Sequence, residues 1–236
     1  MTSTALVTGG SRGIGRAVVE RLSAAGHRVV FTYANDKAAA DEVAALCPGS
    51  IAVRADQTSL SSLDEMFAPI QDGLDILVNN AGVIVPAAVA DVTAEEFDRA
   101  LTANTKVPLL AIGRAAPLMR DGGRIVNIST INTVSPAPGN VLYCASKAAL
   151  EQVTAVAARE LGPRGITVNT VSPGATDTDL LRAHNSAEEL ALSAAWSALG
   201  RLGTPHDVAA VVAFLTTADA GWITGQNIRA TGGLLV

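Results

Sequence analysis

The sequence is poor in residues that bind metals or form cross-links. Cysteine occurs only as Cys47 and Cys144, and neither has the spacing of a metal site or of a disulfide framework. The three histidines, His27, His184 and His206, have no ligand partners near them in the sequence. We therefore expect no metal, and a reducing compartment, the cytoplasm, as the location.

Aromatic side chains and basic charge are also scarce. Aromatics make up 3% of the chain, too few for a platform on which nucleic-acid bases stack. The 17 basic residues are outnumbered by 22 acidic ones, and the net charge of −5 argues against binding to nucleic acid or to an anionic membrane surface. No apolar run approaches the roughly 20 residues that cross a bilayer, and the first residues lead directly into an apolar strand. We expect neither membrane insertion nor secretion.

Apolar residues are abundant, at 49% of the chain, and they recur in two alternating kinds of segment. Short runs rich in Val, Ile and Leu alternate with longer stretches of helical periodicity, which is typical of βαβ units around a parallel sheet. Runs that are apolar throughout, such as Ile76-Leu77-Val78, indicate strands covered on both faces. The expected strands are 4–8, 28–33, 51–55, 75–79, 124–129, 166–171 and 227–230, and the expected helices are 13–25, 36–46, 59–70, 94–118, 143–161 and 205–217.

This pattern predicts an α/β fold in which residues 1–236 form a single doubly wound (Rossmann) domain, with a seven-stranded parallel sheet and helices on both faces. The stretch from Pro173 to about Ser186 is irregular. Because ligands of such sheets bind beyond the carboxyl ends of the strands, we interpret the segment of about 174–200 as a lid over the substrate. A plain surface loop is the alternative.

A glycine-rich turn lies between the first expected strand and the first expected helix. Its glycines at 9, 13 and 15 permit a tight turn and a close approach of the backbone to a dinucleotide pyrophosphate, which the helix N-terminus attracts. At the end of the second strand, where an acid would favour NAD, the chain has Tyr33, and Arg12 can pair with a 2′-phosphate. NADP(H) is therefore the favoured cofactor, with NAD(H) still possible because Asp36 can also reach the ribose.

Tyr143 and Lys147 lie four residues apart in an expected helix and so share one face of it. A neighbouring ammonium lowers the pKa of a phenol, whose ordinary value is about 10, and lets it exchange a proton with a carbonyl or alcohol oxygen. An isolated pair of this kind is usually an ordinary surface contact. Its position after the fifth strand, in a chain that already has a dinucleotide loop, favours catalysis instead.

Together these motifs resemble the short-chain dehydrogenase/reductase family, from residue 4 to about residue 233. A stretch at 200–208, followed by 223–226 and 232–233, further resembles the branch that contains 3-oxoacyl-[acyl-carrier-protein] reductases. The matching features are the glycine loop at 9–15, Asp56, the run Asn79-Asn80-Ala81-Gly82, Asn104, the Tyr143/Lys147 pair and Pro173-Gly174.

The resemblance implies a role for each matching residue. Tyr143 is the implied general acid, Lys147 lowers its pKa and holds the nicotinamide ribose, and Asn104 anchors a water-linked proton relay to Lys147. Thr130 takes the place of the hydroxyl residue that orients the carbonyl, with Ser129 as the alternative. The implied catalytic residues are Asn104, Thr130, Tyr143 and Lys147, and the implied cofactor-binding residues are Gly9, Ser11, Arg12, Gly13, Ile14, Gly15, Asp56, Gln57, Asn80, Ala81, Gly82, Tyr143, Lys147, Pro173, Gly174, Thr176 and Thr178.

The implied activity is the NADP(H)-dependent interconversion of a ketone and a secondary alcohol. Apolar residues on the substrate side, among them Val83, Val134 and Leu180, favour an uncharged, hydrophobic small-molecule ketone. A 3-oxoacyl-thioester reductase acting on acyl carrier protein is the alternative: Arg164 matches a basic docking position, but Asp121 departs from that pattern.

A second alternative is a regulator that binds the cofactor without catalysis. The family resemblance also implies a homotetramer, built through the helices near 94–118 and 143–161 and the C-terminal strand and helix.

Overall fold

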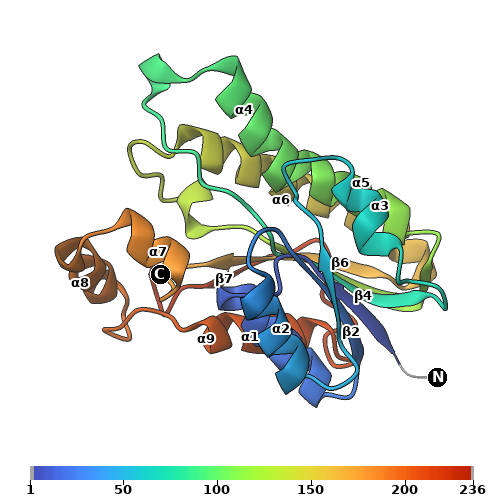
Figure 1. Cartoon of the computed structure of the whole chain (residues 1–236). Coiled ribbons are helices and arrows are strands. Elements are labelled where there is room, and N and C mark those ends of the chain that lie inside the picture. Colours follow the sequence, from blue (N-terminus) through green and yellow to red (C-terminus); the bar gives the residue numbers. More distant parts are fainter. Residues whose placement is uncertain (1–2, 235–236) are drawn as a thin grey trace.

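The computed structural model describes residues 3–234 and contains a seven-stranded, fully parallel sheet (Figure 1). The strand order is β3-β2-β1-β4-β5-β6-β7. The strands are β1 (Thr4–Val7), β2 (Arg28–Tyr33), β3 (Ile51–Arg54), β4 (Leu74–Asn79), β5 (Met119–Ile128), β6 (Thr167–Pro173) and β7 (Asn227–Ala230).

Helices cover both faces of the sheet, because alternate side chains of each buried strand point to opposite faces. Ala5 and Val7 of β1 pack in a core with helices α1, α2 and α9, whereas Leu6 packs in a second core with α3, α5 and α6. The helices are α1 (Gly13–Ala24), α2 (Lys37–Leu46), α3 (Ser62–Phe67), α4 (Ala94–Leu101), α5 (Val107–Ala115), α6 (Val141–Leu161), α7 (Asp179–His184), α8 (Ala187–Trp196) and α9 (Pro205–Leu215). The doubly wound α/β prediction is confirmed.

The structure differs from the predicted elements at three places. Strand β5 begins at Met119 instead of Arg124, because Met119 pairs with Leu74 of β4 and the register then shifts before Arg124 pairs with Ile76. The helix predicted at 94–118 is interrupted by a π-helical turn, Thr102–Lys106. The stretch after Pro173 is not irregular throughout, since it contains α7 and α8.

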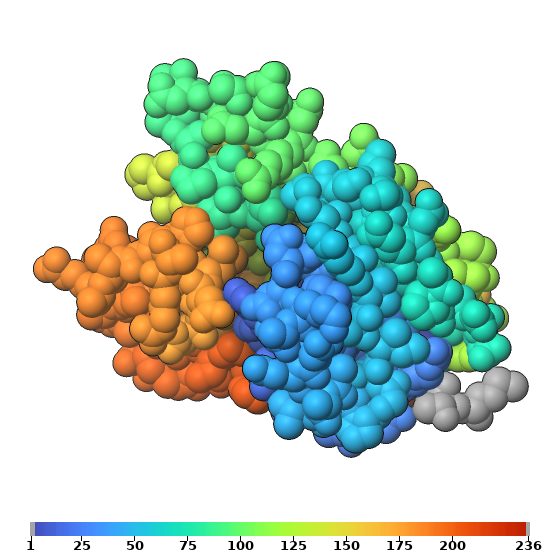
Figure 2. All heavy atoms as spheres, viewed as in Figure 1, coloured from blue at the N-terminus to red at the C-terminus, as the bar shows by residue number. Residues whose placement is uncertain are grey.

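The order of the sheet reverses between β1 and β4, and a crevice forms beyond the carboxyl ends of strands at such a reversal. On the visible face the molecule is hollowed between the blue N-terminal part, the green part around α4 and the orange part that contains α7 and α8 (Figure 2). Within residues 3–234, no helix is long and apolar enough to cross a membrane.

Candidate active site

The glycine loop ends in a helix N-terminus whose amides have no partner. Arg12 is the N-cap residue of α1, makes no side-chain cap hydrogen bond, and no acid lies in the first turn. Because the first N–H groups of a helix have no intrahelical acceptor, the amides of Gly13, Ile14 and Gly15 are available to an anion. Gly15 has to be glycine, since a Cβ there would lie 2.0 Å from the Gly9 carbonyl oxygen.

Asn80 fastens the loop after β4 to the glycine loop. Its Nδ2 donates to the carbonyls of Thr8 (2.9 Å) and Gly9 (3.1 Å), while the Thr8 hydroxyl accepts from the amides of Asn80 and Ala81, both at 3.0 Å. The side-chain amide of Asn80 is thus used to hold the crevice in shape. The backbone of Ala81 and Gly82 continues along the same loop.

Beyond β3, Asp56 and Gln57 differ in their surroundings. Asp56 is exposed, and its carboxylate accepts from the Thr58 amide (2.9 Å) and hydroxyl (2.8 Å). Gln57 is buried, and its Nε2 has no hydrogen-bond partner among the described residues. An unpaired buried donor costs about 1–3 kcal/mol, so Gln57 is a credible contact for a ligand with an acceptor, as an adenine ring has.

Arg12 is paired with Asp36 where the chain leaves β2. Asp36 is also the N-cap of α2 and accepts from the Ala39 amide at 2.9 Å. The Ala39 N–H, and after it the Arg12 guanidinium, holds the pKa of the Asp36 carboxyl below its usual value. An incoming phosphate would therefore compete with Asp36 for Arg12, a pairing that the sequence did not predict.

Tyr143 and Lys147 both lie near the carboxyl end of β5. The Tyr143 phenol lies beside the hydroxyl of Thr130, which is buried just after that strand and acts to lower the pKa of the phenol. The Lys147 Nζ donates to the Ile128 carbonyl at 2.8 Å, and the side chain is 3% exposed. Burial lowers the pKa of Lys147 to about 8, against an opposing effect of the Glu151 charge.

In the chain without a cofactor, burial of the phenol dominates and raises the pKa of Tyr143 to about 12, although the neighbouring Thr130 hydroxyl acts in the opposite direction. In this state the Tyr143 hydroxyl keeps its proton at neutral pH.

Asn104 lies on the π-helical turn, in the position where an extra residue widens the helix. Its side chain donates to the Val83 carbonyl (2.9 Å) and to the Ser146 hydroxyl (2.9 Å), and accepts from the Val83 amide (2.8 Å). A Cβ at Gly82 would lie 2.9 Å from Asn104 Oδ1 and 3.2 Å from Lys147 Nζ. Gly82, Asn104 and Lys147 are therefore packed together.

Ser129 and Thr130 face different partners. The Ser129 hydroxyl donates to a carboxylate oxygen of Glu151 at 2.6 Å, whereas Thr130 contacts the phenol of Tyr143. The contacts of these two hydroxyls favour Thr130 as the residue beside Tyr143. Glu151 and Ser146 were missed from the sequence, although Glu151 lies on the Tyr143/Lys147 face of the helix, eight residues after the tyrosine.

The residues after β6 run alongside β7 and then reach the glycine loop. The Gly174 amide donates to the Ala230 carbonyl (3.0 Å), and the Thr176 hydroxyl donates to the Gly174 carbonyl (3.0 Å). Thr178 is the N-cap of α7, and a Cβ on Gly13 would lie 3.3 Å from its methyl group. The start of the segment 174–200 therefore packs against the candidate pyrophosphate site. Pro173 is buried at the end of β6.

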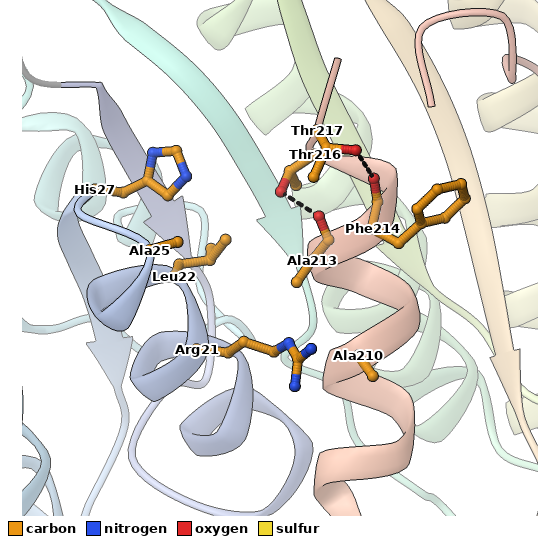
Figure 3. Close-up of a pocket in the computed structure, with 9 residues that line it drawn as sticks. All are labelled: Arg21, Leu22, Ala25, His27, Ala210, Ala213, Phe214, Thr216 and Thr217. Carbon is orange, nitrogen blue, oxygen red and sulfur yellow. Dashed lines mark hydrogen bonds between the residues drawn. The ribbon is translucent and has the colours of Figure 1, made fainter. Parts of the chain in front are cut away.

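A separate cavity of about 420 Å³ lies between the C-terminal parts of α1 and α9, at the opposite end of α1 from the glycine loop (Figure 3). Its Thr216 and Thr217 hydroxyls are bonded within the chain, to the Ala213 and Phe214 carbonyls. None of the sequence-predicted site residues lines it. In residues 3–234, no three His, Cys, Asp or Glu side chains cluster as a metal site.

Comparison with known proteins finds relatives along nearly the whole chain. A family model described as enoyl-(acyl carrier protein) reductase matches residues 9–235. An uncharacterised oxidoreductase of Methylorubrum extorquens is 41% identical over 98% of this chain and 96% of its own length. A tetrahydroxynaphthalene reductase of Pyricularia oryzae is 37% identical over 97% of this chain and 88% of its own. The crystal structure of the angucycline C-6 ketoreductase LanV with bound NADP is 42% identical, with a TM-score of 0.93 over 99% of this chain and 95% of that chain.

Removing the buried ammonium should stabilise the cofactor-free protein. We expect Lys147→Met to raise the free energy of unfolding at pH 7 by up to about 3 kcal/mol, since one pKa unit corresponds to about 1.4 kcal/mol and the lost bond to Ile128 offsets part of the gain. The pKa of Lys147 is about 8 in the folded chain and 10.5 ordinarily. Between these values the unfolded chain binds more protons, so the wild type gains stability as pH rises and the advantage of the variant disappears.

Denaturant unfolding of both proteins from pH 7 to pH 10.5 measures how the difference between their free energies of unfolding falls as pH rises. Lys106→Met, at an exposed lysine of the π-helical turn, is the control and should show no such pH-dependent difference. A destabilised Lys147→Met protein at pH 7 would contradict the assignment of a burial penalty to this lysine.

Proposed function

The chain belongs to the short-chain dehydrogenase/reductase family of oxidoreductases, and we propose that it reduces a hydrophobic ketone to a secondary alcohol with NADPH. The observation that carries this proposal is the convergence of Tyr143, Thr130 and Lys147 at the end of the sheet where the amides of α1 are free. A proton donor and an anion-binding helix end are what a reaction with a phosphorylated hydride carrier needs.

NADP(H) suits the residues at the ribose end of the crevice. Tyr33 ends β2 where an acid would repel a 2′-phosphate, and the Arg12 guanidinium lies nearby. LanV, a relative of similar fold, is known with bound NADP. We propose that Gly13 to Gly15 hold the pyrophosphate, that Gln57 contacts adenine, and that Lys147 reaches the nicotinamide ribose.

When bound, the cofactor supplies the hydride that goes to the carbonyl carbon. The protein supplies the proton: the Tyr143 hydroxyl gives its proton to the carbonyl oxygen as that oxygen gains charge, and the phenol is reprotonated from solvent afterwards. Thr130 orients the same carbonyl oxygen. The pKa of about 12 keeps Tyr143 protonated at neutral pH, as a proton donor to the ketone oxygen has to be.

A fused-ring aromatic ketone is the substrate class we propose. Two relatives are named for a hydroxynaphthalene and an angucycline, and exposed apolar side chains follow the site on α7 and α8, among them Leu180 and Trp196. An acyl carrier protein is less suitable, because the Arg164 guanidinium is already bound to Asp121 (2.9 Å) and to the Ala116 carbonyl (2.6 Å).

We further propose that the whole chain is one domain and that residues 174–200, with α7 and α8, close over the substrate as a lid. Thr178, at the base of this segment, packs against Gly13. This contact couples binding of the cofactor at the glycine loop to the position of the lid. The free thiols of Cys47 and Cys144 suit a reducing compartment such as the cytoplasm, which we propose as the location.

Replacing the proton donor should separate catalysis from binding. We expect Tyr143→Phe to lower kcat for ketone reduction by at least about 10²-fold, since general acid catalysis contributes that much. NADPH binding and thermal stability should be nearly unchanged, because the ring is retained. Turnover followed by NADPH absorbance, with Cys144→Ala as the control on the neighbouring residue, tests this; full activity in Tyr143→Phe would exclude the mechanism.

The Arg12–Asp36 pair should limit affinity for the 2′-phosphate. We expect Asp36→Asn to tighten NADPH binding about three- to tenfold relative to NADH, because Arg12 is released while an asparagine can still cap α2. Asp41→Asn, which breaks the Lys37 pair on the same helix, is the matched control. Calorimetric titration with each cofactor measures the ratio of the dissociation constants for NADPH and NADH. Weaker NADPH binding by Asp36→Asn would mean that the Asp36 carboxylate contacts the ribose.

We also propose a homotetramer in which a second copy of this chain covers an apolar groove between α5 and α6. The groove is lined by Leu109 and Val156, among others, whose side chains are 47% and 55% exposed. Trp222, which lies outside the groove near β7, is 98% exposed and is a second apolar surface that a copy of the chain can cover. Val156→Lys should reduce the mass seen by light scattering to a smaller assembly, since a charge cannot be buried there without a partner. Val89→Lys, at another exposed valine, should leave the tetramer intact; a monomeric wild type would reject the proposal.

A further inference from the structure

Three polar contacts join one face of α6 to three consecutive residues at the end of β5. Lys147 Nζ donates to the Ile128 carbonyl (2.8 Å), Glu151 accepts from the Ser129 hydroxyl (2.6 Å), and the Tyr143 phenol lies beside the Thr130 hydroxyl. The helical residues are spaced by four, so they form one row along the helix. Two of these contacts belong to the proposed reaction, and the third, Ser129–Glu151, has no role in it so far.

Glu151 is the charge that acts on Lys147. On α6 the nearest other titratable group is Tyr143, whose phenol is protonated, and this helix also carries Cys144, Arg159 and Glu160. Strand β5 carries Arg120, Asp121 and Arg124 in its first half, and the π-helical turn carries Lys106, which is exposed. The remaining neighbours, Gly82, Asn104 and the Ile128 carbonyl, are uncharged. Among the described residues, the carboxylate of Glu151 alone opposes through its charge the effect of burial on the pKa of Lys147.

The Ser129 contact fixes where that carboxylate lies. A carboxylate on a helix surface is free to rotate toward solvent, but Glu151 is half-buried and receives a short hydrogen bond from a buried hydroxyl. Hydrogen bonds to an ionised acceptor are among the strong ones in proteins, so this bond favours one position of the side chain. That position is on the same helix face as Lys147.

We propose that Ser129 and Glu151 form a positioning pair for Lys147, in which the hydroxyl fixes the carboxylate and the carboxylate favours the charged form of the buried lysine on the same helix face. This inference rests on the proposed function, in which the charged lysine serves the cofactor and the proton donor. It assigns Ser129 a role other than contact with the substrate. It also makes Glu151 a positioning residue, since it acts through Lys147.

The chain has only three lysines, Lys37, Lys106 and Lys147, so the titration of Lys147 can be observed directly by NMR of lysine labelled with ¹³C at Cε. In the cofactor-free wild type we expect a midpoint near 8. Glu151→Gln should lower it by about half a unit or more, and Ser129→Ala should lower it by less, because the charge remains but is no longer fixed. Glu151→Asp should restore part of the shift. Glu65→Gln, at an exposed glutamate of α3, is the control with the same change in net charge.

The same proteins are then assayed for ketone reduction with NADPH across pH. We expect the alkaline limb of the kcat profile in Glu151→Gln to move to lower pH by the same amount as the NMR midpoint, with the KM for the ketone unchanged. A lysine midpoint within about 0.2 unit of wild type in Glu151→Gln would overturn the inference, even if that variant is less stable or less active. A wild type that reduces no ketone would instead remove the proposed function, while the titration would still decide whether the pair acts on Lys147.

Discussion

The Lys147 ammonium is buried against a backbone carbonyl, and the neighbouring elements are arranged to accommodate that charge. Burying an ammonium is costly, and the pKa of about 8 reports the cost. Position 82 requires glycine, because the Cβ of any other residue would lie too close to the side chains of Asn104 and Lys147. The π-helical turn brings Asn104 to the same place, where it also bonds with Ser146 one residue before the lysine. The buried charge thus lowers the stability of the chain at a residue that the proposed function needs in its charged form.

The two halves of the site depend on different parts of the sheet. The end of β1 supplies the free amides of α1, and Asn80 ties the loop after β4 to them, which keeps the crevice at the reversal of strand order open to an anion. The end of β5 supplies Thr130 and the carbonyl of Ile128, against which α6 presents Tyr143 and Lys147. Because both ends lie at the same edge of a parallel sheet, residues more than a hundred positions apart in the sequence, such as Gly13 and Tyr143, belong to one proposed site.

Much of this arrangement is predictable from sequence, because burial on both faces leaves continuous apolar strands, and a glycine loop between a strand and a helix is typical of a dinucleotide site. The π-helical turn was not predictable in this way, since the apolar pattern of 94–118 continues through it with the same period. Helix α8 has no buried residue, so it does not pack against the core, although its capping box, Ser186 with Glu189, was a readable signal. The Arg12–Asp36 pair joins residues of two loops, and the direction of the Tyr143 pKa depends on burial, which spacing alone does not give.

The proposed reaction is the reduction of a free, hydrophobic ketone with NADPH. It is tested by the initial rates of NADPH and of NADH oxidation by the purified chain with fused-ring aromatic ketones, simple aliphatic ketones and a 3-oxoacyl thioester. We expect NADPH oxidation with the aromatic ketones, slower rates with NADH, and little oxidation with the thioester. Tight NADPH binding without oxidation in the presence of any of these carbonyl compounds would contradict it and would indicate a cofactor-binding protein that does not catalyse ketone reduction.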